Sequence, residues 1–244
     1  MKTMFLALAS FSVLEFRVAS ADGWTPVAPR DEIRPQFQRT ETGGKSGDGL
    51  LAIRADKREG LHGWWQKTFP VSAGQHYRFS AWRRAENVAV PRRSVLARVV
   101  WGDDAGNPVP RREGVLTNFA KNIVATAEPE YPREKFEQSA SHDDWIEVSG
   151  TYQAPPGATQ ARVELHLLWA PHGQVQWSDV AFEPTAAPAP RKVRLAAVHY
   201  RPRNAKTLMD ACRQFAPHIE EAARRKADLV VLGETLTYAG VGSS

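Results

Sequence analysis

The sequence predicts a mainly β protein: an antiparallel β-sandwich followed by a short α/β (βαβ) unit. Three observations lead to this prediction. Apolar and polar residues alternate in several short segments between residues 48 and 183, as in strands with one buried face. A proline-rich segment then interrupts the chain. Beyond it, apolar residues recur at helical spacing between two short apolar runs.

Alternation marks the central strands of the sandwich, at 77–81, 95–101, 146–152 and 163–169, with turn-forming residues at 103–107, 155–157 and 171–173. It places Trp101 and Trp169 on the same faces as valine and leucine, so we expect both indole rings in the core. Residues 108–143 are polar and carry prolines and charges of both signs, which indicates an insertion on the rim of the sandwich.

The segment 184–190 reads PTAAPAP and is typical of a semi-rigid linker. We therefore expect a signal peptide (1–20), a sandwich (21–184), a linker (185–192) and a second domain (193–244).

The second domain begins with a short apolar strand at 193–198. One helix face follows, made of Leu208, Cys212, Phe215, Ile219 and Ala222. Pro217 should kink or split this helix, and Thr207 with Asp210 forms a capping pair at its start. The apolar run 229–232 has the composition of a strand buried on both faces.

Composition excludes several classes of protein. Of the 244 residues 42% are hydrophobic, which is enough for a real core. Cys212 is the single cysteine, so neither an intramolecular disulfide nor a cysteine-based zinc site can form, and we expect no metal and no cofactor. The net charge of +5 arises in 191–244, because the rest of the chain holds 22 residues of each sign. A solvated helix face explains this excess, so we expect no nucleic-acid partner.

The first 20 residues resemble a signal peptide, with Lys2, a mostly apolar run at 4–14 and small residues at 18–20. We expect export to the periplasm or the extracellular space. No segment reaches transmembrane length, so we expect no membrane span.

Most of 48–184 resembles the jelly-roll modules of the carbohydrate-binding and galactose-binding-like type, through GLLAIRADKREGLHGWWQKTFPVSAGQHYRFSAWRRA, WIEVSGTYQAPPGATQARVELHLLW and VQWSDVAFEP. Because sugar rings stack on aromatic faces, Trp64, Trp65 and Trp82 are the candidate ligand-binding residues. Trp64 and Trp65 are adjacent and must face opposite sides of a strand. The resemblance offers a polysaccharide partner, but tryptophan is common in the cores and rims of β-sandwiches, which favours a structural or accessory role for the same residues over sugar binding. Asp179 stands where such modules carry a calcium ligand, but a lone aspartate in a turn favours a hydrogen-bonding role.

The stretches VRLAAVHY and EEAARRKADLVVLGETLTYAG resemble the beginning of the nitrilase (carbon–nitrogen hydrolase) superfamily, with its αββα sandwich. The resemblance makes Glu234 the catalytic general base, although Gly233 replaces the usual proline before it. It implies a small amide or nitrile substrate and leaves open a homo-oligomer formed through this domain. The family's lysine and cysteine would follow Ser244, so we expect a truncated domain that is inactive alone.

The sequence therefore predicts an exported hydrolase of non-peptide C–N bonds with a β-sandwich before it. The alternative is a carbohydrate-binding or structural sandwich with a degenerate tail.

Overall fold

The structure is a computed structural model that describes residues 23–111, 125–134, 144–234 and 236. Its contacts divide the chain into two compact units, Met1–Ala187 and Pro188–Ser244. The division falls inside the proline-rich segment. The residues of the expected signal peptide lie outside the described part of the chain.

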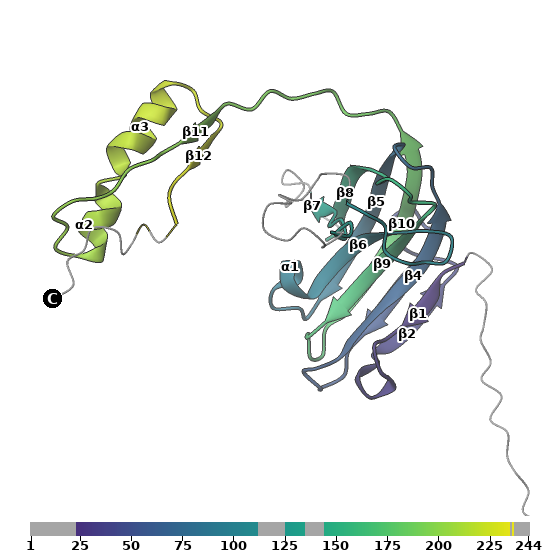
Figure 1. Ribbon diagram of the computed structural model, residues 1–244. Coiled ribbons are helices and arrows are strands. Elements are labelled where there is room, and N and C mark those ends of the chain that lie inside the picture. Colours follow the sequence, from purple (N-terminus) through teal and green to yellow (C-terminus); the bar gives the residue numbers. More distant parts are fainter. Residues whose placement is uncertain (1–22, 112–124, 135–143, 235, 237–244) are drawn as a thin grey trace, which may run out of the picture. The chain divides into compact units, whose positions relative to one another are not determined.

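The first unit is an antiparallel β-sandwich of the jelly-roll type (Figure 1). Its elements are β1 (Thr25–Val27), a 3-10 helix (Asp31–Ile33), β2 (Gln36–Thr40), β3 (Leu50–Arg54), β4 (His62–Pro70), β5 (His76–Glu86), α1 (Pro91–Ser94), β6 (Val95–Gly102), β7 (Arg133–Glu134), β8 (Ile146–Gln153), β9 (Gln160–Leu168) and β10 (Gln174–Thr185). One sheet has the order β1-β4-β9-β6, and the other has the order β2-β3-β10-β5-β8-β7. The mainly β, antiparallel fold predicted from the sequence is thus confirmed.

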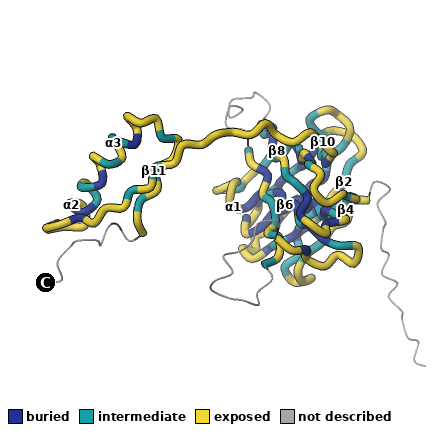
Figure 2. Tube along the Cα trace, turned by 45° about the horizontal axis from the view of Figure 1, so that its top comes forward, coloured by how far each residue is buried: buried dark blue, intermediate teal, exposed yellow. Residues whose placement is uncertain are grey.

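The core lies between the two sheets, where one face of each strand is buried (Figure 2). The residues that β6 contributes to this core are Val95, Ala97, Val99 and Trp101, and those of β9 are Ala161, Val163, Leu165 and Leu167. These are alternate positions, as the sequence predicts, because successive side chains of a strand point to opposite faces.

Two features of the sandwich differ from the sequence-based expectation. Strands occur before the alternating segments at 48–183, although within the expected sandwich of 21–184, since β1 pairs with β4 and β2 pairs with β3. Trp169, expected in the core, is 55% exposed. It follows the end of β9 at Leu168 and has a φ of 53°. The change to the left-handed region ends the alternation, so its side chain does not continue the buried row.

The second unit contains a βαβ arrangement, as predicted. Its elements are β11 (Leu195–Ala197), α2 (Leu208–Arg213), α3 (Ala216–Arg224) and β12 (Leu229–Val231). β11 and β12 pair in parallel. Pro217 lies in the first turn of α3, where a proline is tolerated, and the helix is split in two as expected. Thr207 and Asp210 form a complete capping box at α2.

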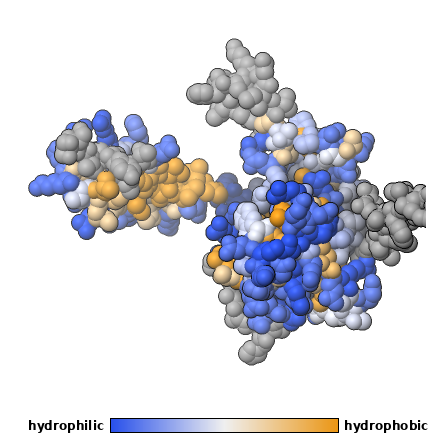
Figure 3. All heavy atoms as spheres, turned by 90° about the horizontal axis from the view of Figure 1, so that it is seen from below, coloured by the Kyte–Doolittle hydropathy of each residue, from blue (hydrophilic) through white to orange (hydrophobic). Residues whose placement is uncertain are grey.

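β12 departs from the prediction of a strand buried on both faces. Leu229 and Val231 are about half exposed, and so are Leu195 on β11 and Met209 on α2. Figure 3 shows hydrophobic residues gathered on this unit. Of the described residues of this unit, only α2 and α3 are available to pack on the two-stranded sheet, and its strands keep Leu195, Leu229 and Val231 exposed.

No helix in the described part of the chain is both long enough and apolar enough to cross a bilayer.

Candidate functional site

The three tryptophans proposed from the sequence lie in three different environments. Trp65 is on the inner face of β4, is 5% exposed, and donates its indole N–H to the carbonyl oxygen of Ala52 at 3.1 Å. Trp64 points to the outer face of the four-stranded sheet. Trp82 points to the outer face of the six-stranded sheet. Trp64 and Trp65 therefore face opposite sides of β4, as predicted, and the three rings do not form one site.

The outer face of the four-stranded sheet carries an unusual set of side chains. Antiparallel register aligns two rows across β4, β9 and β6: Trp64, His166 and Leu96, and beside them Gln66, Glu164 and Arg98. Glu164 and His166 are 1% and 2% exposed, although they point away from the core. The side chains of this face thus cover one another and form an ordered, mostly polar layer. We call this layer the outer platform; it consists of His62, Trp64, Arg98, Tyr131, Arg162, Glu164 and His166.

Glu164 is the centre of this platform. Its Oε2 accepts from Arg98 Nη2 at 2.5 Å and from His166 Nε2 at 3.0 Å. Its Oε1 accepts from Arg162 Nε at 2.9 Å. One buried carboxylate therefore holds two guanidinium groups and one imidazole in fixed positions.

The Glu164 carboxyl is ionised in the folded protein. Burial alone would raise its pKa, but the hydrogen bonds from His166, Arg98 and Arg162 outweigh burial and hold the pKa at about 2. An ionised carboxylate accepts hydrogen bonds and donates none. His166 must therefore donate its Nε2 proton to Glu164.

This assignment sets the tautomer of the next histidine. With its proton on Nε2, neutral His166 accepts at Nδ1, and His62 Nε2 lies 3.1 Å from that atom. His62 then carries its own proton on Nε2, and its Nδ1 is left as an acceptor. Burial, then the nearby His166 and Arg98, lowers the pKa of His62 to about 4. Burial also lowers the pKa of His166. Both imidazoles are neutral near pH 7.

Aromatic rings flank the charged centre. Trp64 stacks on His166, with ring centroids 5.0 Å apart and an interplanar angle of 28°. Beyond β6, Glu130 pairs with Val99, which places the neighbouring Tyr131 on the outer side, where its hydroxyl hydrogen-bonds Arg98. Tyr131 is 51% exposed. Three inter-strand spacings, roughly 14 Å, separate the two aromatic positions.

The outer face of the six-stranded sheet is built differently. Arg54 and Arg84 donate to Gln174 and Gln176 across β10. Its two tryptophans are covered by cations: Lys45 Nζ lies 5.0 Å from the Trp82 ring centre, and Arg84 lies 5.0 Å from that of Trp145. An ammonium group therefore lies over a face of Trp82, whereas Trp64 stacks on the neutral imidazole of His166.

The expectation that Asp179 is a hydrogen-bonding residue agrees with the geometry, since it accepts from Ser46 Oγ. Within the described residues, no group of three or more His, Cys, Asp or Glu side chains is placed to hold a metal ion.

In the second unit, Glu234 is exposed in the turn that follows β12. Cys212 is half-buried on α2. The structure does not test the roles that the resemblance gives to these positions.

Of the outer platform, sequence reasoning identified Trp64 and missed the other six residues: His62, Arg98, Tyr131, Arg162, Glu164 and His166. A signal was present in β9, where Arg162, Glu164 and His166 alternate with wholly apolar neighbours. Alternation alone marks such residues as solvent-facing, and it does not reveal that Glu164 is buried.

Comparisons with known proteins concern the fold. No protein-family model matches the sequence, and no curated protein matches it. The CBM22-1 xylan-binding domain from Paenibacillus barcinonensis is similar to 69% of this chain over 90% of its own length, with 10% identity and a TM-score of 0.43. The CBM22-1-GH10 modules of a Clostridium thermocellum xylanase are matched over 30% of their length, with 14% identity and a TM-score of 0.41. A bacteriophage CBA120 tailspike domain is matched over 20% of its length, with 12% identity and a TM-score of 0.46. This chain thus spans less than a third of the latter two.

Proposed function

We propose that the first unit is a carbohydrate-binding module that binds a polysaccharide chain on the outer platform. The observation that carries this proposal is the buried Glu164 carboxylate, which fixes Arg98 and Arg162 on an open sheet face with Trp64 and Tyr131 on either side.

The charged network around Glu164 lies outside the apolar core of the sandwich. A buried charged network contributes little net stability compared with apolar packing of the same volume, because each charge must be desolvated. This network lies on the outer side of the four-stranded sheet and contributes nothing to the apolar core. It does hold hydrogen-bonding groups in fixed directions, which reduces the entropy lost when a ligand binds.

The chemistry of the platform fits sugars. The apolar faces of a pyranose ring pack on aromatic rings, and its hydroxyl groups need planar donors and acceptors in fixed geometry. Arg98 and Arg162 supply donors, and His62 Nδ1 supplies an acceptor. A sheet face with an aromatic residue on either side suits binding along the interior of an extended polysaccharide better than binding of the end of a polysaccharide.

The test is calorimetric titration with xylohexaose, cellohexaose and laminarihexaose, and gel retardation by soluble polysaccharides. We expect saturable binding to at least one class. Trp64→Ala should weaken it at least about tenfold, because the open stacking surface is lost.

Trp82→Ala is the matched control, since it removes an indole from the outer face of the other sheet. We expect it to bind as the unaltered protein does. The proposal fails if Trp64→Ala binds normally while Trp82→Ala does not, or if no polysaccharide in the panel binds. Trp65→Ala is unsuitable, because that ring belongs to the core.

The hydrolase role of residues 193–244, with Glu234 as general base, stays a prediction. The parallel β11–β12 pair agrees with the α/β start that the resemblance implies.

A further inference from the structure

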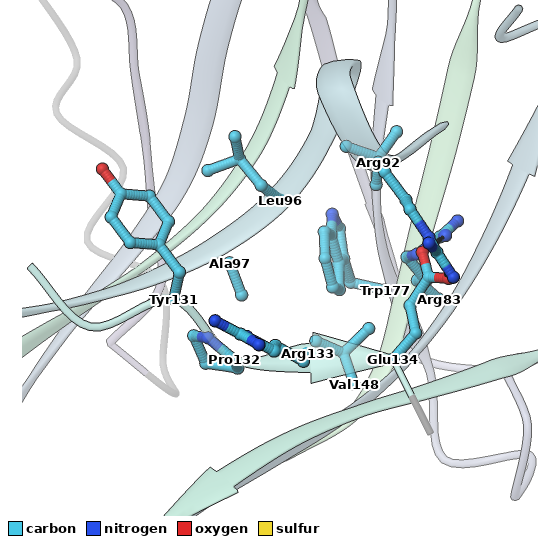
Figure 4. A pocket seen from close by; sticks show the side chains of 11 residues that line it. Arg83, Arg92, Leu96, Ala97, Tyr131, Pro132, Arg133, Glu134, Val148 and Trp177 are labelled. Carbon is cyan, nitrogen blue, oxygen red and sulfur yellow. Dashed lines mark hydrogen bonds and ion pairs between the residues drawn. The ribbon is translucent and has the colours of Figure 1, made fainter. Parts of the chain in front are cut away.

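A second concave site lies where the sandwich opens between the edge strand β6 of one sheet and the β7–β8 edge of the other (Figure 4). It is a cavity of about 400 Å³. Val95, Leu96, Ala97 and Val148 provide apolar walls, and the indole of Trp177 stands at its inner end. This volume is in the range of small-molecule sites, about 300–1,000 Å³.

The polar lining is positively charged. Arg83, Arg92 and Arg133 contribute three guanidinium groups, and Glu134 is the carboxylate among the described residues that line the cavity. Arg83, with its side chain 3% exposed, donates to Glu134 Oε1, while Arg92 Nε lies 3.4 Å from Glu134 Oε2. The lining therefore carries a net charge of two positive units.

Trp177 adds an unsatisfied donor. The residue is fully buried, and its indole Nε1 has no hydrogen-bond partner among the described residues. Buried polar groups in folded proteins are almost always paired, so an orphan donor at a cavity calls for an acceptor there. The cavity thus presents positive charge that Glu134 neutralises only in part, together with an indole N–H that has no acceptor among the described residues.

We propose that this cavity binds a small organic acid, with its carboxylate against Arg92, Arg133 and the Trp177 N–H and its apolar body against Leu96 and Val148. A carboxylate matches the planar fork of arginine and supplies the missing acceptor. The apolar walls select an acid with a hydrocarbon body over an inorganic anion. The cavity and the outer platform share Tyr131, but Arg92, Arg133 and Trp177 line the cavity and are not part of the platform, so variants at these positions test this inference separately from the polysaccharide proposal.

Benzoate is the probe, benzamide is its neutral isostere, and sulfate is the anion without an apolar body. We expect benzoate to bind with a dissociation constant on the order of 1 mM, as befits a ligand of this size. Benzamide and sulfate should bind at least tenfold more weakly. NMR gives the location: the indole N–H resonance that is missing from the spectrum of Trp177→Phe should move downfield as benzoate saturates the site.

Two variants of exposed arginines test the recognition of the charge. Arg92→Gln and Arg133→Gln should each weaken benzoate at least fivefold. Arg93→Gln, in the same short helix but outside the lining, should leave the affinity unchanged. The proposal is overturned if no saturable benzoate binding occurs up to 20-fold above the expected constant, if benzamide or sulfate binds equally well, or if Arg93→Gln weakens binding as much as Arg92→Gln.

Discussion

Glu164 shows how a single buried carboxylate organises a surface. An isolated charge with 1% exposure would be costly, and the side chain would take up a proton instead. Three donors surround it, and they keep it ionised with a pKa of about 2. The charge in turn aligns Arg98 and Arg162 and fixes the tautomers of two histidines. Binding chemistry at this surface thus depends on a residue that a ligand would hardly reach.

The same residues predict acid sensitivity. His62 has a folded-state pKa of about 4 against an ordinary 6.5, so between these values the unfolded chain binds more protons than the folded one. The contribution of neutral His62 to the free energy of unfolding is therefore fully present above pH 6.5, and it is lost as the pH falls toward 4. The lowered pKa of Glu164 acts in the same direction at lower pH. The ionised carboxylate stabilises the folded protein above pH 4.5, and this contribution is lost as the pH falls toward 2 and the carboxylate is protonated.

We expect His62→Gln to flatten the pH dependence of the unfolding free energy between pH 6.5 and 4 by on the order of 2 kcal/mol. Urea denaturation across this range measures it. His172→Asn replaces an exposed histidine in the turn before β10 and serves as the control. An unchanged slope in His62→Gln would show that His62 is not held neutral by burial.

At the scale of elements, β4 connects the core to the outer platform. It presents Trp65 inward and Trp64 outward, and its pairing with β9 sets Trp64 opposite His166. Gly63 also faces inward, in close contact with Phe37 of β2 in the other sheet and with Pro35, which directly precedes β2. A Cβ at Gly63 would lie 2.7 Å from atoms of both residues. The absence of a side chain there lets the two sheets approach each other beside Trp65.

Gly63→Ala should therefore lower the unfolding free energy by about 1–3 kcal/mol through overpacking. Gly60→Ala is the matched control, because a Cβ at Gly60 meets nothing within 4 Å. Thermal and urea unfolding compare the two variants. Equal stabilities would mean that Phe37 and Pro35 move aside freely.

At the scale of the whole molecule, the two units differ in how completely they bury their apolar residues. The sandwich has a continuous core that includes Ile53, Phe79 and Trp177, each 0% exposed. The second unit has a smaller set of buried side chains, including Ala211 and Phe215, and exposes large apolar ones. Burial of apolar area is the main favourable term in folding, so the sandwich should carry most of the stability.

A chain of residues 21–187 should consequently fold alone and unfold in a single cooperative transition. Scanning calorimetry can check this through the agreement of calorimetric and van't Hoff enthalpies. A broad, non-cooperative transition would show that residues 188–244 complete the core, and the boundary in the proline-rich segment would then be wrong.

Much of the architecture could be predicted from local patterns. Alternation identified β5, β6, β8 and β9, because the period of a strand is a property of the chain itself. Pro217 and the capping pair of Thr207 and Asp210 likewise act within one turn of helix, and both did what the sequence predicts. The opposite facing of Trp64 and Trp65 follows from the same geometry.

The candidate sites were decided by tertiary structure. Strand register, which the sequence does not encode locally, placed Trp64 beside His166 and set Trp82 on the opposite sheet. The burial of Glu164 depends on Arg98 from β6 and Arg162 from its own strand closing over it. The cavity gathers Arg83, Arg92, Glu134 and Trp177, the first and last of which are 94 positions apart in the sequence. The sequence by itself determined which segments became strands and helices, since periodicity is local, whereas these sites depend on side chains that only sheet pairing brings together.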